Sequence, residues 1–304
     1  MKESSEFILV THRRRKSGKS LCKPQFATEL RKDTEENSQK FDYELYNRII
    51  KKIHKVIMPS MSDAKYTNHV IEVLDDCLTN LHYNGISEII CYGLGNLSEN
   101  KQARYQLGLL LCLRKYYDDT PVYVYDPVFS SEEKKILQYF GLQIINRNEE
   151  GKRVLKHKTT LMYMPHCSHH LTNNFLYTNW GNQLKHCILL SNSFGDIVCD
   201  YRETPRLRKF LPEIRYLHDI APYVTEIKLK NLFEYDSAFS SQSVHFFTKK
   251  KLRRVPIDFW KNREEPQYLK TYENLCPDCS DCIQEEKLKK KKTKKKKNAI
   301  KNEQ

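Results

Sequence analysis

Hydrophobic positions along the chain follow two spacings, one typical of helices and one typical of strands. Over residues 41–57 the apolar residues recur every three or four positions, which predicts an amphipathic helix that ends at Met58–Pro59. The same spacing predicts a second helix over 63–83, followed by a turn at Asn84–Gly85. Beyond this turn, short apolar runs alternate with helical patterns.

This alternation predicts the fold class. Strands are expected over 87–93, 121–127, 142–146, 159–165, 186–193, 224–229 and 243–247, and helices over 100–117, 131–141 and 169–180. Short strands separated by helical patterns are typical of βαβ units with a parallel sheet. We therefore expect a three-layer, Rossmann-like α/β domain with a mainly parallel sheet over residues 41–250, in which two helices precede the first strand.

The two ends of the chain differ from this central part. Residues 1–40 are polar and basic, and residues 251–304 read as loop-rich, with a cysteine cluster and a run of lysines. The net charge is +14, of which residues 1–23 supply +5 and residues 287–304 supply +9, so the segment between them is balanced. Self-repelling basic tails are expected to be disordered. The distribution argues against a folded nucleic-acid reader and leaves weak, nonspecific nucleic-acid binding through the tails.

Cysteine usage and hydropathy bear on the compartment. Most of the ten cysteines stand singly, several of them within apolar runs, as is typical of reduced, buried thiols. The sequence has no apolar run of 18 residues and no apolar core of a signal peptide near its N-terminus, so no membrane span is expected. These features predict a cytoplasmic protein, with the nucleus as a second compartment.

A glycine-rich turn joins the first predicted strand to its helix in "YGLGNLSENKQA". Gly93 and Gly95 fit the first two glycines of a phosphate-binding turn, Asn96 follows them, and Ser98 stands where the third glycine is usual. Asp126, at the end of the next strand, is in the position of an acid that holds a ribose. We therefore consider a nucleotide or S-adenosyl ligand at this turn. The alternative is a tight turn beside an aspartate that caps the next helix.

The segment "MPHCSHHL" (164–171) follows another predicted strand and carries three histidines and a cysteine. Metal binding, catalysis by Cys167 with His166, and a purely structural helix start at Ser168 are three interpretations. Adjacent side chains on a loop point apart, which weakens the first two. We favour a small-molecule contact at the carboxyl edge of the sheet, formed by His166, Asn179 and Trp180 together with Asn192 of the "SNSF" strand end.

A third cluster, Cys276, Cys279 and Cys282, lies in "LCPDCSDC". Thiolates at this spacing ligate zinc or an iron–sulfur cluster, but the fourth ligand is missing. The alternative is an exposed cysteine cluster that binds nothing.

Four segments in order, "ICYGLGNLSENKQARYQLGLLL", "VYVYDPVFSSEEKKIL", "MPHCSHHLTNNFLYTNW" and "LLSNSF", resemble the SRR-like domain family, named for Sensitivity to Red light Reduced in plants. The resemblance covers about residues 80–250. It implies a role in circadian-clock output, in animal members regulation of heme biosynthesis, and in fungal members a link to microtubules. It brings no established reaction and no catalytic residue. Given this link to heme, Cys276–Pro277 matches the dipeptide of heme-regulatory motifs, so a heme contact is one candidate cofactor interaction.

Three functions follow from these observations. The first is a regulatory protein that acts through protein partners, still to be identified, and binds a small molecule. The second is an enzyme that uses a nucleotide or S-adenosylmethionine at the Gly93–Gly95 crevice. The third is an RNA- or microtubule-associated protein that acts through the lysine-rich tail. Because the sequence shows no paired carboxylates and no nucleophile elbow, it favours a protein without catalytic activity.

Overall fold

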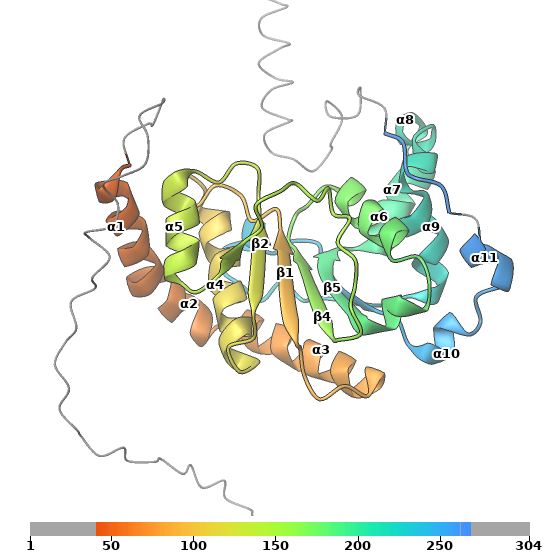
Figure 1. Ribbon diagram of the computed structural model, residues 1–304, viewed down its shortest axis with the longest axis horizontal. Helices are drawn as coiled ribbons and strands as arrows, with labels where there is room; N and C mark the ends of the chain where they lie inside the picture. The colour runs from red at the N-terminus through yellow and green to blue at the C-terminus, as the bar shows by residue number, and fades with distance from the viewer. Residues whose placement is uncertain (1–40, 262, 269–304) are drawn as a thin grey trace, which may run out of the picture. The chain divides into compact units, whose positions relative to one another are not determined.

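Seven strands form a single sheet in the computed structural model, which describes residues 41–261 and 263–268 (Figure 1). The strands are β1 (Glu88–Tyr92), β2 (Val122–Tyr125), β3 (Gln143–Ile144), β4 (Thr160–Met164), β5 (Cys187–Asn192), β6 (Thr225–Lys228) and β7 (Gln242–Phe246). Their spatial order is β3-β2-β1-β4-β5-β7-β6. The first five strands are parallel, and β7 is antiparallel to both of its neighbours. The expectation of a mainly parallel sheet is confirmed.

Helices connect the strands and cover both faces of the sheet (Figure 1). They are α1 (Tyr43–Lys52), α2 (Met58–Ser62), α3 (Lys65–Leu81), α4 (Lys101–Tyr116), α5 (Ser131–Tyr139), α6 (His169–Thr178), α7 (Phe194–Glu203), α8 (Pro205–Arg208), α9 (Arg215–Ile220), α10 (Lys249–Leu252) and α11 (Ile257–Lys261), with the 3-10 helix η3 (Asn182–His186) before β5. These elements belong to one compact unit that begins at Asp42.

Two hydrophobic cores, one on each face of the sheet, establish the three-layer architecture. Successive residues of a strand point to opposite faces. Ile89 and Cys91 of β1 accordingly pack in the core that α3, α4 and α5 complete, whereas Ile90 and Tyr92 pack in the core that α6 and α9 complete. The central strands β1 and β4 are buried along their whole length. Their continuous apolar sequence is therefore explained by burial on both faces.

One expectation from the sequence needs correction, and two segments contain helices that the sequence analysis did not assign. Pro59 does not end the first helical region: a π-helical turn over Ile53–Ile57 leads into α2, and Pro59 stands in the first turn of α2, where a backbone N–H needs no partner within the helix. Residues 194–223, to which the sequence analysis assigned no element, form α7, α8 and α9. Within the segment after residue 250 that was expected to be loop-rich, α11 forms, and Trp180 stacks on Phe259 at a ring distance of 4.8 Å.

Among the residues that the structure describes, no helix is both long and apolar enough to cross a lipid bilayer.

Candidate ligand site at the carboxyl edge of the sheet

The connections of β1 and β4 diverge at the centre of the sheet. These strands are neighbours, yet β1 continues through α4 toward β2, and β4 continues through α6 toward β5 on the other side. In open α/β sheets, ligands commonly bind beyond the carboxyl ends of the two strands at which the strand order reverses. The loops after β1, β2, β4 and β5 meet at this edge.

The turn after β1 adopts the backbone conformation that its glycines allow. Gly93 and Gly95 have φ angles of 68° and 82°, in the left-handed region that residues with a side chain rarely adopt. A Cβ atom on Gly93 would lie 2.3 Å from the Sγ of Cys167, whereas one on Gly95 would meet only Ala103, at 3.6 Å. Gly93 is therefore required for packing against the loop after β4, and Gly95 faces more open space.

Asp126 lies beside this turn, as expected of an acid at the end of the second strand. One carboxylate oxygen accepts a hydrogen bond from the backbone N–H of Gly95 at 2.8 Å, and the other accepts one from Val128 at 3.0 Å. Its exposed fraction is 8%. Asp126 thus orients the glycine turn and its own loop, and each oxygen keeps a second lone pair with which it could accept a bond from a ligand.

The reason for serine in place of a third glycine lies in helix α5. The backbone N–H and hydroxyl of Ser98 donate to one carboxylate oxygen of Glu133, at 2.8 and 3.0 Å, and Ser130 N–H donates to the other at 3.1 Å. Glu133 is fully buried. The sequence analysis missed this anchor, although the capping box that begins at Ser130 could have indicated it. Arg104 supports the same turn by donating to the carbonyl groups of Leu97 and Ser98, at 2.6 and 3.1 Å.

Cys167 is part of the packing of the loop after β4. Its Sγ donates to the carbonyl oxygen of Tyr92 at 3.0 Å, and burial raises the pKa of the thiol well above its usual range. A neutral, buried thiol is a poor nucleophile. The ring of the adjacent His166 lies 3.1 Å from the carbonyl oxygen of Ala238, so the two side chains turn away from each other. The structure does not bring them together as a catalytic pair.

The next two histidines have other partners. Ser168 caps α6, as expected, by accepting a hydrogen bond from the N–H of His170. The Nε2 of His169 lies 2.6 Å from the hydroxyl of Tyr201, and the Nε2 of His170 lies 3.3 Å from a carboxylate oxygen of Glu213.

Burial, with a smaller contribution from His170, lowers the pKa of His169 to about 3, and burial lowers that of His170 to about 4. Both rings are therefore neutral at physiological pH. Within residues 41–261 and 263–268, no three His, Cys, Asp or Glu side chains are grouped so that they could hold a metal ion.

Asn192 lies at the carboxyl edge of the sheet, as expected, whereas Asn179 and Trp180 do not. At the end of β5, the amide of Asn192 donates to the carbonyl oxygen of Cys167 at 3.0 Å, which links it to the same edge. Asn179 is fully buried, and its side chain bonds only backbone groups, among them the N–H of Leu155 at 2.8 Å. Trp180 donates to the carbonyl oxygen of Phe259 at 3.1 Å.

Asn179 and Trp180 follow the end of α6, which leads back toward the start of β5. They are therefore remote from the loops at the carboxyl edge. The expected set is reduced to Gly93, Gly95, Asn96, Asp126, His166 and Asn192. Cys276, Cys279 and Cys282 lie outside the described residues, and their metal or heme binding stays a prediction.

Solved structures offer only weak likenesses to this fold. A mutant of MtNAS in complex with S-adenosylmethionine has 10% identity and a TM-score of 0.35, over 67% of this chain and 72% of that one. The plantazolicin methyltransferase BpumL in complex with SAH has 8% identity and a TM-score of 0.30, over 68% of this chain and 96% of that one. Likenesses at this level carry no information about a ligand.

Relatives with similar sequences come from animals and a plant. An SRR1-like protein of Mus musculus is 41% identical over 108 residues, 34% of this chain and 43% of that protein. An SRR1-like protein of Drosophila melanogaster is 28% identical over 193 residues, 63% and 66% of the two chains. Protein SENSITIVITY TO RED LIGHT REDUCED 1 of Arabidopsis thaliana is 26% identical over 174 residues, 53% and 58%. The matched regions span less than two thirds of each relative.

The model of the SRR1 domain matches residues 41–246, which is most of the described fold and includes every strand of the sheet. The resemblance drawn from the four sequence segments is thereby confirmed, and the chain belongs to the SRR1 domain family.

Proposed function

We propose that this chain is a regulatory protein whose α/β domain binds a small ligand of the nucleotide or S-adenosyl class at the carboxyl edge of β1 and β4. The observation that carries the proposal is the meeting of the Gly93–Asn96 turn, Asp126 and Asn192 at the point where strand order reverses. None of the hydrogen bonds of the described residues uses the backbone N–H groups of Leu94 and Asn96. Such N–H groups beside a glycine turn are suited to the oxygens of a ligand.

The residues at this edge favour binding over chemistry. The thiol of Cys167 is buried and neutral, and Asp126 is engaged with two backbone N–H groups. A general acid or base needs a side chain that faces the reacting atoms and exchanges a proton near neutral pH. An enzyme that uses a nucleotide or S-adenosylmethionine in the same crevice is the alternative.

The biological role that we propose follows from the family. The protein would act through partner proteins on circadian-clock gene expression and on heme biosynthesis, in the cytoplasm and the nucleus. Deletion of its gene should change the rhythm of clock transcripts and the level of heme in the same cells. Unchanged rhythm and unchanged heme would contradict this role, whatever the ligand.

The ligand is tested by native mass spectrometry of the freshly purified chain and by calorimetry with S-adenosylmethionine, SAH and ATP. Gly95→Ala adds a methyl group at a position with room for it, so the fold should survive a strain of about 1–2 kcal/mol while the ligand is excluded. We expect at least tenfold weaker binding. Gly85→Ala is the matched control, because a Cβ there meets nothing within 4 Å.

Equal binding by both glycine variants would place the ligand elsewhere. No binding of any probe and no co-purified molecule would remove the ligand from the proposal. Release of a methylated or hydrolysed product would favour the enzyme.

A further inference from the structure

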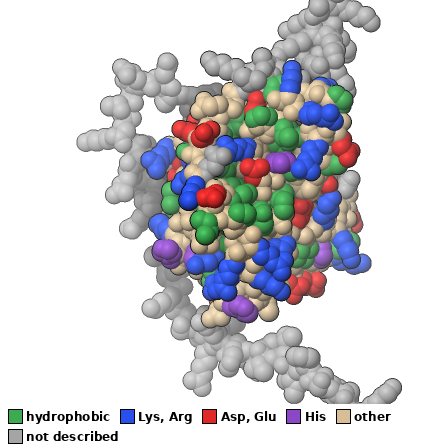
Figure 2. Space-filling view, turned by 90° about the vertical axis from the view of Figure 1, so that its right-hand side faces the viewer, with side chains coloured by type: hydrophobic (Ala, Val, Ile, Leu, Met, Phe, Trp, Pro, Cys, Tyr) green, Lys and Arg blue, Asp and Glu red, His purple; other side chains and the backbone are tan. Residues whose placement is uncertain are grey.

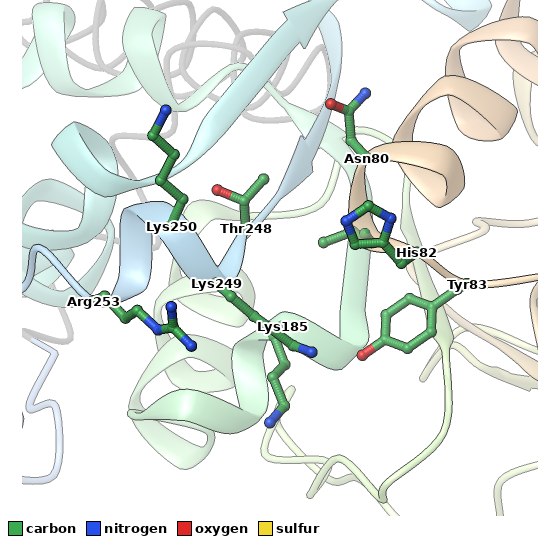
Figure 3. A pocket seen from close by; sticks show the side chains of 9 residues that line it. Asn80, His82, Tyr83, Lys185, Thr248, Lys249, Lys250 and Arg253 are labelled. Atoms are coloured by element: carbon green, nitrogen blue, oxygen red, sulfur yellow. The ribbon is translucent and has the colours of Figure 1, made fainter.

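A cavity of about 500 Å³ opens at the other edge of the sheet, away from the glycine turn (Figure 3). Its walls come from segments far apart in sequence: the end of α3, the 3-10 helix η3 before β5, and α10 after β7. All three adjoin the amino ends of parallel strands, because β7 is antiparallel and Phe246, near its end, pairs with Ile188 near the start of β5. A cavity of this volume suits a small molecule.

The lining of this cavity is basic. Lys185, Lys249, Lys250 and Arg253 line it, and no aspartate or glutamate does. Within the described part of the chain, none of the four has a carboxylate oxygen within 4 Å. Some cations elsewhere in the described residues do have a carboxylate partner, as Lys158 has Glu88 at 2.7 Å. Four uncompensated cations around one concavity repel one another, and an anion would relieve that repulsion.

Two of these charges act on one neighbouring ring. The Nδ1 of His186 lies 2.8 Å from the hydroxyl of Tyr83, a residue of the facing wall. Burial lowers the pKa of His186, and the charges of Lys185, His157 and Lys249 lower it further. Lys185 and Lys249 come from different elements, so the positive potential is concentrated at one place and is not spread along one helix.

Figure 3 shows how the four cationic side chains lie. Lys249 extends toward Tyr83, Lys185 points downward in this view, and the guanidinium of Arg253 lies to the left of both. The ammonium group of Lys250 points away from the other three. In Figure 2, Lys and Arg side chains gather near the lower part of the face, the level at which Figure 1 places α10.

We propose that this cavity binds a small, multiply phosphorylated ligand, held by Lys185, Lys249 and Arg253. Three cations match a ligand with at least two negative charges, and the forked guanidinium of Arg253 suits the oxygens of a phosphate. A nucleic-acid backbone would need a basic groove or stripe that follows the strand, whereas these cations surround a single concavity. The site is separate from the glycine turn and does not depend on the ligand proposed there.

The test measures binding of tripolyphosphate to the full-length chain by calorimetry at 150 mM salt. Lys249→Gln with Arg253→Gln should weaken this binding at least twentyfold. Lys115→Gln with Arg254→Gln is the matched control, because it also removes one exposed lysine and one exposed arginine, and neither of them lines the cavity. The control should change affinity less than threefold. The basic tails are the same in every variant, so a difference between the pairs reports the cavity.

A second readout separates binding from a general loss of charge. Bound phosphate would offset Lys185 and Lys249, so the pKa of His186, followed by NMR, should rise when tripolyphosphate saturates the wild type. It should not move in the Lys249→Gln, Arg253→Gln variant. Equal losses in both variant pairs, or an unmoved His186, would overturn the site. Binding of single-stranded RNA that is tighter than tripolyphosphate and rises with length would replace it by a nucleic-acid surface.

Discussion

The polar groups of the two candidate sites, one at each edge of the sheet, differ in their partners. At the carboxyl edge, Asp126, Glu133 and Asn192 are engaged with backbone or hydroxyl groups of neighbouring loops. At the amino edge, Lys185, Lys249 and Arg253 have no carboxylate partner within the described residues. The first edge carries the motifs of the family, and much of their chemistry is used to hold the loops. The second carries no motif, and its charge stays available for an anion.

If the loops at the carboxyl edge are held by packing against one another, a single methyl group added at Gly93 should strongly reduce the free energy of unfolding. Gly93→Ala combines a left-handed φ with a Cβ that would lie 2.3 Å from Cys167 Sγ, so we expect a loss of about 3–4 kcal/mol in the free energy of unfolding. Urea denaturation measures it. Cys167→Ala should cost about 1–2 kcal/mol through its lost contacts.

The pair also forms a double-mutant cycle. Because removal of Sγ makes room for the new methyl group, the double variant should be at least 1 kcal/mol more stable than the sum of the two losses predicts. Strict additivity would mean that the backbone angle of Gly93, and not its contact with Cys167, decides the cost.

The histidines of α6 make the carboxyl edge sensitive to acid. The folded chain holds His169 at a pKa of about 3, below the ordinary 6.5, so the unfolded chain binds the proton first as pH falls. The free energy of unfolding is therefore not reduced by His169 above pH 6.5, and it decreases as the pH falls below this value. Between pH 7.5 and 4.5, His169 should account for a loss of about 2–3 kcal/mol in the free energy of unfolding.

His169→Gln should remove this part of the pH dependence, and His54→Gln, on an exposed side chain of the first helical region, should leave it unchanged. Urea denaturation at a series of pH values measures both. The interpretation fails if His169→Gln keeps the slope of the wild type.

At the carboxyl edge, the sequence predicts the features that depend on residues close together in the chain, but not the contacts between residues that are far apart. The glycine turn, the aspartate after β2 and the Ser168 cap follow local patterns, and all three lie where these patterns predict. Asn179 and Trp180 were placed wrongly, because a ten-residue helix carries its last residues about 15 Å from its start. His166 and Cys167 are adjacent in sequence, but their side chains have unrelated partners.

The amino-edge cavity could not be predicted in the same way. Lys185 stands before β5, and Lys249 and Arg253 follow β7, so they meet only because β7 runs antiparallel between β5 and β6. Strand patterns in the sequence predict that a strand exists but not its direction or its neighbours. The balanced charge of residues 24–286 concealed the cluster further, since acids elsewhere in the segment cancel it.

A smaller effect is expected where helix α5 anchors the glycine turn. Glu133→Gln keeps the shape of the side chain but presents an amide N–H to one of the donors, Ser98 or Ser130. One buried donor then loses its acceptor, at a cost of about 2 kcal/mol. Thermal and urea unfolding measure the change, and Glu99→Gln on the exposed side of the same loop is the control. If both variants are equally stable, solvent reaches the Glu133 carboxylate.

The smallest effect on stability is expected at the amino edge, and its small size tests the comparison between the edges. Lys249→Gln and Arg253→Gln remove exposed cations that have no carboxylate partner in the described residues, so no favourable ion pair is lost and some repulsion is relieved. The free energy of unfolding without ligand should stay within about 0.5 kcal/mol of the wild type, with any change toward higher stability.

With saturating tripolyphosphate the wild type should become the more stable of the two, because a ligand stabilises only a chain that binds it. The wild type should then melt at a higher temperature than the variant. A variant that is clearly less stable without ligand would show that these cations support the fold, and the two edges would then differ less than their contacts indicate.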